Sequence, residues 1–428
     1  MSSEHSSTTA GTLWQDRAFL LFWSGRTVTL LGSAITKVVL PILVYRLTGS
    51  ALLTSLLTTL EVVPYFIFGL FAGTLADRVN RRWLMVSCDL LNAVLLGSIP
   101  LAGLLHILTI AQILVVTLLS AIAFVWFDAA NFGALPTLVG RERIVAATSA
   151  IWTVSTVVDI LGPAVGGALA AFIGPTQTLS ADALSYLVSA VSLVLIPRAL
   201  SNVRQVEGEE RPIRQLIEGI GQGIGFIWRH RVVRALTLLG FGNSFTGGAV
   251  LGLLVVYTVQ GLGIPVTDER IGLLFTAGGV GALLASLLLP QVTKRVPVGW
   301  ITLIAMGLNL LCLLGLVVMP FFGLAFVLFT CWEMGYVFVT MNGIALRQLV
   351  TPEHLLSRVN TYARMIAWGG TPFGAAVGGL LAQWTPIRVT YLLVAVGVFL
   401  SIVIGWFSPL REHTMAQELV NPRGGNRF

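Results

Sequence analysis

Residues 108–127 read LTIAQILVVTLLSAIAFVWF, a run without a single charged side chain. An α-helix needs about 20 consecutive apolar residues to cross the hydrocarbon core of a bilayer. A membrane-spanning β-strand would instead alternate apolar and polar residues over about 10 positions, and this run does not. The stretch therefore predicts a transmembrane helix, which satisfies every backbone polar group within itself.

Similar apolar runs recur along the whole chain. Of its 428 residues, 56% are hydrophobic and only 11% are charged, against roughly 25% charged in a typical soluble domain. We therefore expect an all-α membrane protein with twelve transmembrane helices. The expected spans are 18–45, 51–76, 83–104, 108–131, 146–173, 177–197, 235–261, 267–291, 299–319, 321–345, 357–383 and 387–408.

The net charge of +7 could indicate a nucleic-acid partner, but its distribution argues against one. Lys and Arg concentrate in the two tails and in every second connection between spans, whereas only Arg46, Arg270 and Arg388 lie in the alternate connections. Positively charged connections stay on the cytoplasmic side of a membrane. We expect both termini in the cytoplasm and no nucleic acid as partner.

The connections divide the chain into two halves. We expect a cytoplasmic tail at 1–17, a six-helix bundle at 18–197, a linker at 198–234, a second bundle at 235–408 and a tail at 409–428. The first tail lacks the order of a signal peptide and is expected to be disordered. The linker segment RPIRQLIEGIGQGIGFIWRHRVVRAL (211–236) predicts an amphipathic helix on the inner membrane surface.

The two halves also resemble each other. NFGALPTLVGRERI (131–144) matches NGIALRQLVTPEHL (342–355) at one constant offset, and AVGGALA (164–170) matches AVGGLLA (376–382). Chance similarity among Gly- and Ala-rich helices is the alternative, but the matches include polar connection residues. Two six-helix repeats in parallel are a known plan of secondary transporters, with the substrate site between them.

The connection between the second and third spans reads GTLADRVNRR, from Gly73 to Arg82. It resembles the signature loop of the major facilitator superfamily, glycine-x-x-x-Asp-Arg-x-glycine-Arg-Arg. The matching residues are Gly73, Asp77, Arg78, Arg81 and Arg82. Asn80 replaces the second glycine, and we expect it to take the left-handed turn, which Asn tolerates well.

Further stretches are similar to the efflux branch that includes macrolide and enterobactin exporters. They are LLFWSGRTVTLLGSAITKVVLPILVYRLTGSA (20–51) and the Ile-Glu-Gly before the seventh span, while Ser33 departs from the acid common in that branch. The resemblance implies two pseudo-symmetric six-helix bundles, with the first, fourth, seventh and tenth spans lining a central cavity.

Asp128 lies at the inner end of the fourth span, level with the signature loop. A carboxylate there is costly without a partner, and we expect that partner to be Arg81 or Arg78. The resemblance also implies that Asp77 approaches the start of the eleventh span, near residues 357–360. We predict a gating latch made of Asp77, Arg81 and Asp128; a simple cluster of inside-positive charge would not explain the two acids.

GPAVGG (162–167) in the fifth span resembles the antiporter motif of exporters, through Gly162, Pro163, Gly166 and Gly167. Close helix packing by small residues is the alternative reading.

Ionisable residues inside spans are functional candidates by default. Desolvation favours the neutral form of a carboxyl group, which lets it carry a proton. We rank Glu333 first as a proton carrier, then Asp159 and Glu61, because the five histidines fall in tails, connections or span ends. Arg26, Lys37 and Arg364 are candidate cavity charges or partners in buried ion pairs, whereas Asp89 and Asp182 are expected to be structural.

The sequence holds no phosphate-binding loop, no zinc-protease motif and no nucleophile elbow, and its three cysteines fit no metal spacing. We therefore expect no cofactor, no metal and no enzyme activity.

We expect a secondary transporter in the bacterial inner (plasma) membrane. It would export a hydrophobic or amphipathic small molecule, such as an antibiotic, drug or siderophore, in exchange for protons and as a monomer among membrane lipids. Uptake, flipping of a lysophospholipid, or a non-transporting sensor of the same fold are the alternatives.

Overall fold

The computed structural model describes residues 13–76, 79–140, 142–197, 200, 213–318, 320–408 and 410. After a short 3-10 turn, η1 (Leu13–Gln15), the first half is built of six long helices: α1 (Arg17–Thr48), α2 (Ala51–Ala76), α3 (Arg81–Leu104), α4 (Ile110–Val139), α5 (Ile144–Phe172) and α6 (Pro175–Leu195).

The second half begins with a helix that is too polar to span. Its elements are α7 (Ile213–Arg229), α8 (Arg231–Gly252), α9 (Leu254–Val256), the π-helix η2 (Tyr257–Gly261), α10 (Arg270–Val292), α11 (Val298–Val318), α12 (Phe322–Val350), α13 (Glu353–Trp368), α14 (Gly370–Trp384) and α15 (Ile387–Trp406). The described residues hold 11 helices long and apolar enough to span, and 12 when the bent pair Arg231–Gly252 and Leu254–Gly261 counts as one. The expected twelve-helix fold is confirmed.

Two expected spans are interrupted. The seventh begins at Arg231 instead of residue 235 and bends by 49° at Leu253. The eleventh is divided into α13 and α14 at Gly369. A Cβ on Gly370 would lie 2.2 Å from the carbonyl oxygen of Phe241 on α8, so the glycines at this break let α14 approach α8 closely.

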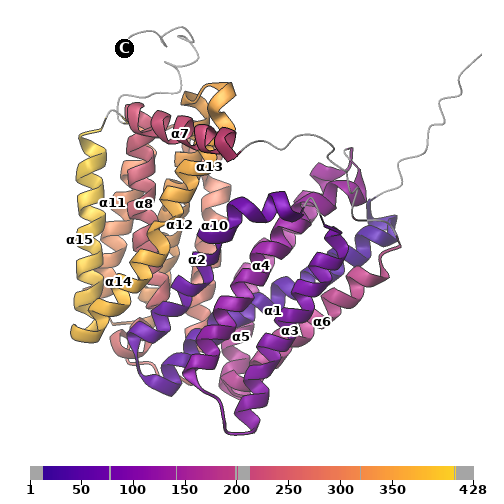
Figure 1. Cartoon of the computed structure of the whole chain (residues 1–428). Coiled ribbons are helices and arrows are strands. Elements are labelled where there is room, and N and C mark those ends of the chain that lie inside the picture. Colours follow the sequence, from indigo (N-terminus) through magenta and orange to yellow (C-terminus); the bar gives the residue numbers. More distant parts are fainter. Residues whose placement is uncertain are drawn as a thin grey trace, which may run out of the picture.

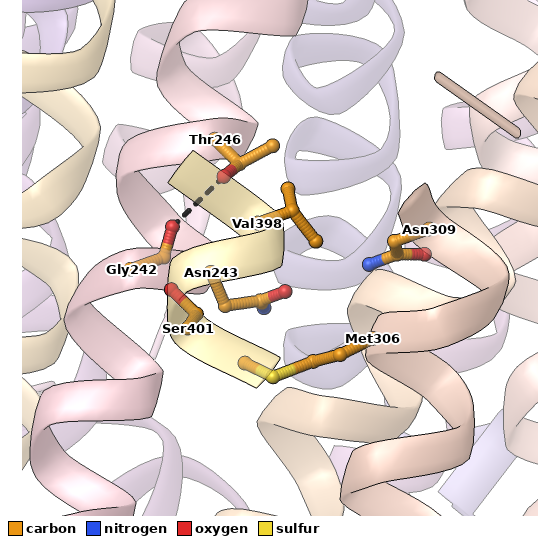
Figure 2. A pocket seen from close by; sticks show the side chains of 7 residues that line it. All are labelled: Gly242, Asn243, Thr246, Met306, Asn309, Val398 and Ser401. Atoms are coloured by element: carbon orange, nitrogen blue, oxygen red, sulfur yellow. Dashed lines mark hydrogen bonds between the residues drawn. The ribbon is translucent and has the colours of Figure 1, made fainter. Parts of the chain in front are cut away.

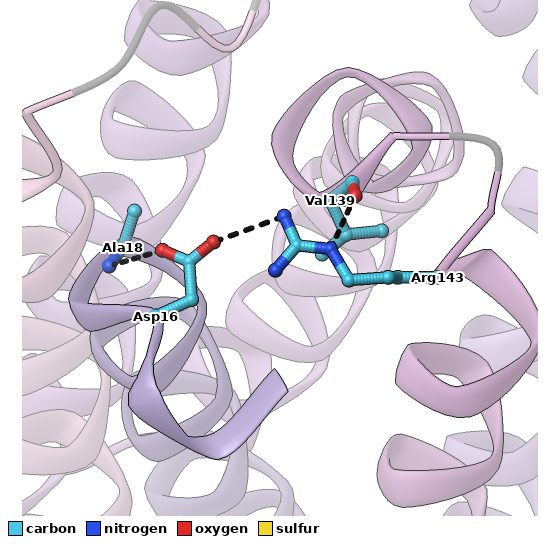
Figure 3. Close-up of polar contacts among 4 residues, drawn as sticks. All are labelled: Asp16, Ala18, Val139 and Arg143. Carbon is cyan, nitrogen blue, oxygen red and sulfur yellow. Dashed lines mark hydrogen bonds and ion pairs between the residues drawn. The ribbon is translucent and has the colours of Figure 1, made fainter. Parts of the chain in front are cut away.

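Residues 13–17, which belong to the tail expected at 1–17, pack against the first bundle; residues 1–12 lie outside the described residues. Leu13 is buried, and Asp16 caps α1 by accepting a hydrogen bond from the backbone N–H of Ala18 at 3.1 Å. Asp16 also accepts a hydrogen bond from Arg143 at 3.2 Å, and Arg143 donates to the carbonyl oxygen of Val139 at 3.0 Å (Figure 3). This contact ties the start of α1 to the connection between α4 and α5.

Within each half, neighbouring helices pack through small and polar residues. A seam between α1 and α6 is an example, because Gly32 leaves room for Asp182 and Ser185. The Asp182 carboxylate accepts hydrogen bonds from Thr36 and from Ser185. Asp182 therefore joins two helices of one bundle, which fits the structural role expected for it.

The second half stands on the left of Figure 1 and the first half on the right. We call the end of the bundles that carries the connection between α6 and α7 the linker end, and the other the opposite end. The helices α2 and α5 of the first half pack against α14 and α10 of the second half, respectively.

Candidate functional site

The halves contact each other toward the opposite end. A Cβ on Gly167 of α5 would lie 2.6 Å from the Cα of Gly272 on α10, so the two backbones touch there. On the other side, Thr59 of α2 donates a hydrogen bond of 3.1 Å to the carbonyl oxygen of Pro372 on α14. Toward the linker end, Trp152 of α5 and Ser286 of α10 are both exposed.

Only part of the signature loop belongs to the described residues. Asp77 and Arg78 lie outside them, while Gly73 lies in the last turn of α2 and Arg82 in the first turn of α3. Arg81 donates a hydrogen bond of 3.0 Å from Nη1 to the carbonyl oxygen of Gly133 on α4. The loop is thereby anchored to α4 at the linker end.

Asn80 does not take the left-handed turn that we expected. Its φ is −69° and its ψ is 106°, and its side chain accepts hydrogen bonds from the backbone N–H groups of Arg82 and Trp83. An N-cap residue has this extended backbone and pairs the first free N–H groups of its helix. The expectation for Asn80 was wrong because the residue serves as the cap of α3.

Of the two partners expected for Asp128, Arg81 is described and Arg78 lies outside the described residues. The cation that acts on Asp128 is Arg26 of α1, whose guanidinium carbon lies 5.2 Å from the ring centre of Phe127 and 5.8 Å from that of Phe124. Arg81 contacts Gly133 instead. The structure thus brings Arg26 and Asp128 together across α1 and α4.

Of the three candidate proton carriers, Glu61 on α2 is half-buried and faces Lys37 on α1. Asp159 on α5 is exposed. A Cβ on Gly279 of α10 would lie 2.6 Å from the backbone carbonyl oxygen of Asp159. Asp159 is therefore beside the contact between the halves.

Glu333 has the most isolated carboxylate of the three. Its Oε2 is buried and, within the described residues, has no hydrogen-bond partner. Gly281 of α10 leaves the space for it, because a Cβ there would lie 2.9 Å from the Glu333 Cβ. The ring of Trp332, the residue before Glu333, stacks between those of Phe329 and Tyr336, with centroid distances of 5.5 and 5.7 Å. Three stacked aromatic side chains thus occupy this part of α12.

The glycine motif of α5 makes close contacts on two sides. A Cβ on Gly162 would lie 2.5 Å from the Ala34 Cβ of α1, while Gly167 contacts α10 as described above. Gly166 and Pro163 are also buried. The motif therefore packs α5 against both its own half and the other half.

A small cavity lies inside the second bundle. Asn243, Thr246, Asn309 and Ser401 are among the residues that line it, on α8, α11 and α15 (Figure 2). Its volume is about 10 Å³, which suits about one water molecule. This cavity is too small for a transported molecule.

The described residues also contain no group of three His, Cys, Asp or Glu that could hold a metal ion.

Sequence comparisons agree with this architecture. The pattern of a family described as transmembrane secretion effector matches residues 8–423. The multidrug efflux pump Tap of Mycolicibacterium fortuitum is 25% identical over 404 residues, covering 90% of this chain and 95% of the pump. Macrolide efflux protein A of Streptococcus pyogenes is 23% identical, covering 88% and 92%. The enterobactin exporter EntS of Salmonella choleraesuis is 24% identical, covering 92% and 94%.

Solved structures with the same fold include a mutant of the nucleoside transporter NupG, with a TM-score of 0.76, 12% identity and coverage of 91% of this chain and 99% of that one. A bacterial homologue of the lysosomal transporter Spinster has a TM-score of 0.72 at 15% identity, covering 95% and 98%. These likenesses establish the two-bundle fold.

Proposed function

This chain belongs to the transmembrane secretion effector family of the major facilitator superfamily, and from that premise we propose that it exports a hydrophobic or amphipathic small molecule in exchange for protons. It is a multi-pass membrane transporter and not an enzyme. The proposal places it in the bacterial inner membrane with both termini in the cytoplasm, so that the linker end faces inward.

Export is supported first by the relatives. The three described above are named as an efflux pump, an efflux protein and an exporter, and each is matched over nearly its whole length. Uptake or lysophospholipid flipping has no comparable support. The charge distribution between connections supports the orientation.

The observation that carries the mechanism is the contact between the halves at one end. Gly167 and Gly272 touch there, whereas Trp152 and Ser286 are exposed toward the linker end. Cargo enters from the cytoplasm in this state. It leaves after the α2–α14 and α5–α10 contacts open and the linker ends close.

The gating latch of Asp77, Arg81 and Asp128 closes the linker end in the second state. Arg81 is already hydrogen-bonded to Gly133 of α4. The charge of Arg26 on α1 acts on Asp128, which also lies on α4. The latch residues thus have supports on α1 and α4. Asp77 of the same loop reaches the start of α13 when the linker ends meet.

Glu333 carries the proton in this scheme. Its Oε2 is buried and has no hydrogen-bond partner among the residues that the structure describes, and it lies where α12 packs on α10. The helix α10 in turn contacts the first half. A carboxylate there is costly when charged, so gain and loss of a proton changes the stability of this packing. Glu61, facing Lys37, and Asp159 are the second candidates.

The test is growth of a drug-hypersensitive host with and without the gene, across macrolides, tetracyclines and a catecholate siderophore. Raised tolerance that disappears with a protonophore supports proton-driven export. Substrate accumulation inside the cells would contradict export, and efflux that a protonophore does not slow would contradict proton coupling.

A further inference from the structure

We propose that Arg347 and Arg364 form a binding site for a negatively charged group of the cargo, so that the transported molecule is an amphipathic anion. This proposal rests on the proposed function in one respect, namely that the bound anion is the transported molecule. The site lies on α12 and α13, at the linker end of the second half.

Arg347 is a buried cation with two unpaired nitrogen atoms. The residue is 4% exposed, and neither Nε nor Nη1 has a hydrogen-bond partner within the described residues. The apolar pattern predicts that the tenth span ends at residue 345, which would place Arg347 in a solvated connection. Because α12 continues to Val350, the guanidinium lies inside the packed bundle instead.

The charged group that acts on Arg347 is another cation, Arg364 of α13. Glu333 lies on the same helix as Arg347, but 14 residues along an α-helix correspond to about 21 Å. Arg347 is buried whereas Arg364 is exposed, and no acid acts on Arg347 among the side chains that the structure describes. A buried cation beside a like charge is costly. An anionic ligand removes this cost by pairing with both.

The face of α13 that carries Arg364 adds two further features. Asn360, Arg364 and Trp368 are spaced four residues apart, which places them on one face of the helix. The Arg364 guanidinium carbon lies 5.5 Å from the ring centre of Trp368, and the Asn360 Oδ1 is buried without a partner among the described residues. The site thus offers two guanidinium groups, an acceptor for a hydroxyl group and an exposed indole ring for an apolar body.

The first half provides the contrast. Its two candidate cavity cations are both opposed by acids, because Arg26 faces Asp128 and Lys37 faces Glu61. Each of these cations thus has an acid acting on it or near it in the structure. Among the described residues, the candidate cavity cation with no acid named beside it is Arg364 in the second half.

The test is binding by the purified full chain in phosphatidylcholine nanodiscs, with 1-naphthylacetate and its neutral analogue 1-naphthylacetamide as probes. Because a hydrogen bond to a charged group contributes about 1.5–3 kcal/mol, the acid should bind at least about tenfold more tightly than the amide. Arg347→Gln and Arg364→Gln should each remove this preference. Arg295→Gln, an exposed arginine at the same end of the same half, should keep it.

Equal binding of the two probes to the wild type, or an unchanged preference in Arg347→Gln, would overturn the proposal. Nanodiscs that contain phosphatidylglycerol test a lipid headgroup as the occupant. If this lipid weakens binding of the acid to the wild type, the site belongs to lipid phosphate and the assignment to cargo is wrong; unchanged binding supports cargo.

Thermal unfolding gives a second measurement. Replacing an unpaired buried charge relieves its desolvation cost, so Arg347→Gln should unfold at a higher temperature than the wild type. A lower unfolding temperature would mean that Arg347 has an acidic partner within the chain. Neither the binding nor the unfolding measurement requires transport. Both can therefore be interpreted even if the growth test shows no export.

Discussion

Arg81 at the start of α3 donates a hydrogen bond of 3.0 Å to the carbonyl oxygen of Gly133 on α4. Its guanidinium atoms lie 2.6–2.8 Å from the position of a Cβ on Gly133. Gly133 thus accepts the hydrogen bond of Arg81 and leaves space for its guanidinium group. A substitution at Gly133 disturbs this contact without changing a charged residue.

Gly133→Ala should therefore impair transport while leaving folding intact. The added methyl group displaces only the flexible end of Arg81, so the protein should stay folded, with an unfolding temperature lowered by no more than the lost hydrogen bond accounts for. Loss of a hydrogen bond to a charged group, about 1.5–3 kcal/mol, predicts efflux slowed about tenfold or more. Drug efflux from cells with matched protein levels measures this.

Gly343→Ala is the matched control, because it lies on the corresponding helix α12 and nothing surrounds its Cβ position within 4 Å. It should export at the wild-type rate and be slightly more stable, since alanine favours a helix over glycine by about 0.5–1 kcal/mol. Equal rates for all three proteins would remove Arg81 from the latch.

Arg26 and Asp128 should be energetically coupled. Asp128→Asn leaves Arg26 against Phe124 and Phe127 without its counter-charge, and Arg26→Gln leaves Asp128 unpaired. Each single change should destabilise the protein, and the double change should cost less than the sum by about 0.5–3 kcal/mol. Unfolding of the four proteins measures the coupling, and additive effects would show that the two charges do not interact.

Gly167→Ala should weaken the contact between the halves at the opposite end. Its Cβ would lie 2.6 Å from the Cα of Gly272, and backbone cannot yield as a side chain can. Ser55, near the start of α2, is buried against Gly252 of α8 and Gly379 of α14. A cysteine introduced by Ser55→Cys, in a chain without Cys88, Cys312 and Cys331, should then react several times faster with a membrane-impermeant maleimide.

The control for this prediction is Gly307→Ala on α11, whose Cβ position is empty within 4 Å. It should leave the labelling rate unchanged. Equal labelling rates in both variants would show that the Gly167–Gly272 contact does not hold the opposite end closed.

Glu333→Gln should abolish efflux driven by a pH gradient while leaving the protein at least as stable. The amide cannot exchange a proton, and the lost Oε2 has no hydrogen bond to give up within the described residues. Efflux from energised vesicles measures the effect, with Glu269→Gln, an exposed residue before α10, as control. If Glu333→Gln keeps the coupling of the wild type, Glu333 is not the proton carrier, and Asp159 or Glu61 would take that role.

The spans could be predicted from the sequence because lipid demands long apolar helices. The break at Gly369 was not predicted, although Pro372 has no backbone N–H to pair with the carbonyl oxygen of Trp368 and so weakens the helix there. The close approach of Gly370 to Phe241 of α8 depends on tertiary packing and could not be predicted from the sequence. The bend at Leu253 has no proline nearby that would indicate it.

The candidate charges could also be found from the sequence, because an ionised group inside a span is rare. Their partners could not, since partners depend on how each helix is rotated. Asp128 was expected to pair with Arg81 or Arg78 of a nearby connection, and the influence of Arg26 of α1 on it was not foreseen. Arg347 was missed because two or three residues of error at the end of a span decide whether a charge is solvated or buried.

Distances between spin labels test the central claim, that the two halves open and close their ends alternately as a carboxyl group exchanges a proton. Labels on Trp152→Cys of α5 and Ser286→Cys of α10 report on the linker end, in a chain without its native cysteines. The account predicts a long and a short distance whose populations change with pH in the wild type and stay fixed in Glu333→Gln. A single distance that does not respond to pH or to substrate would contradict it.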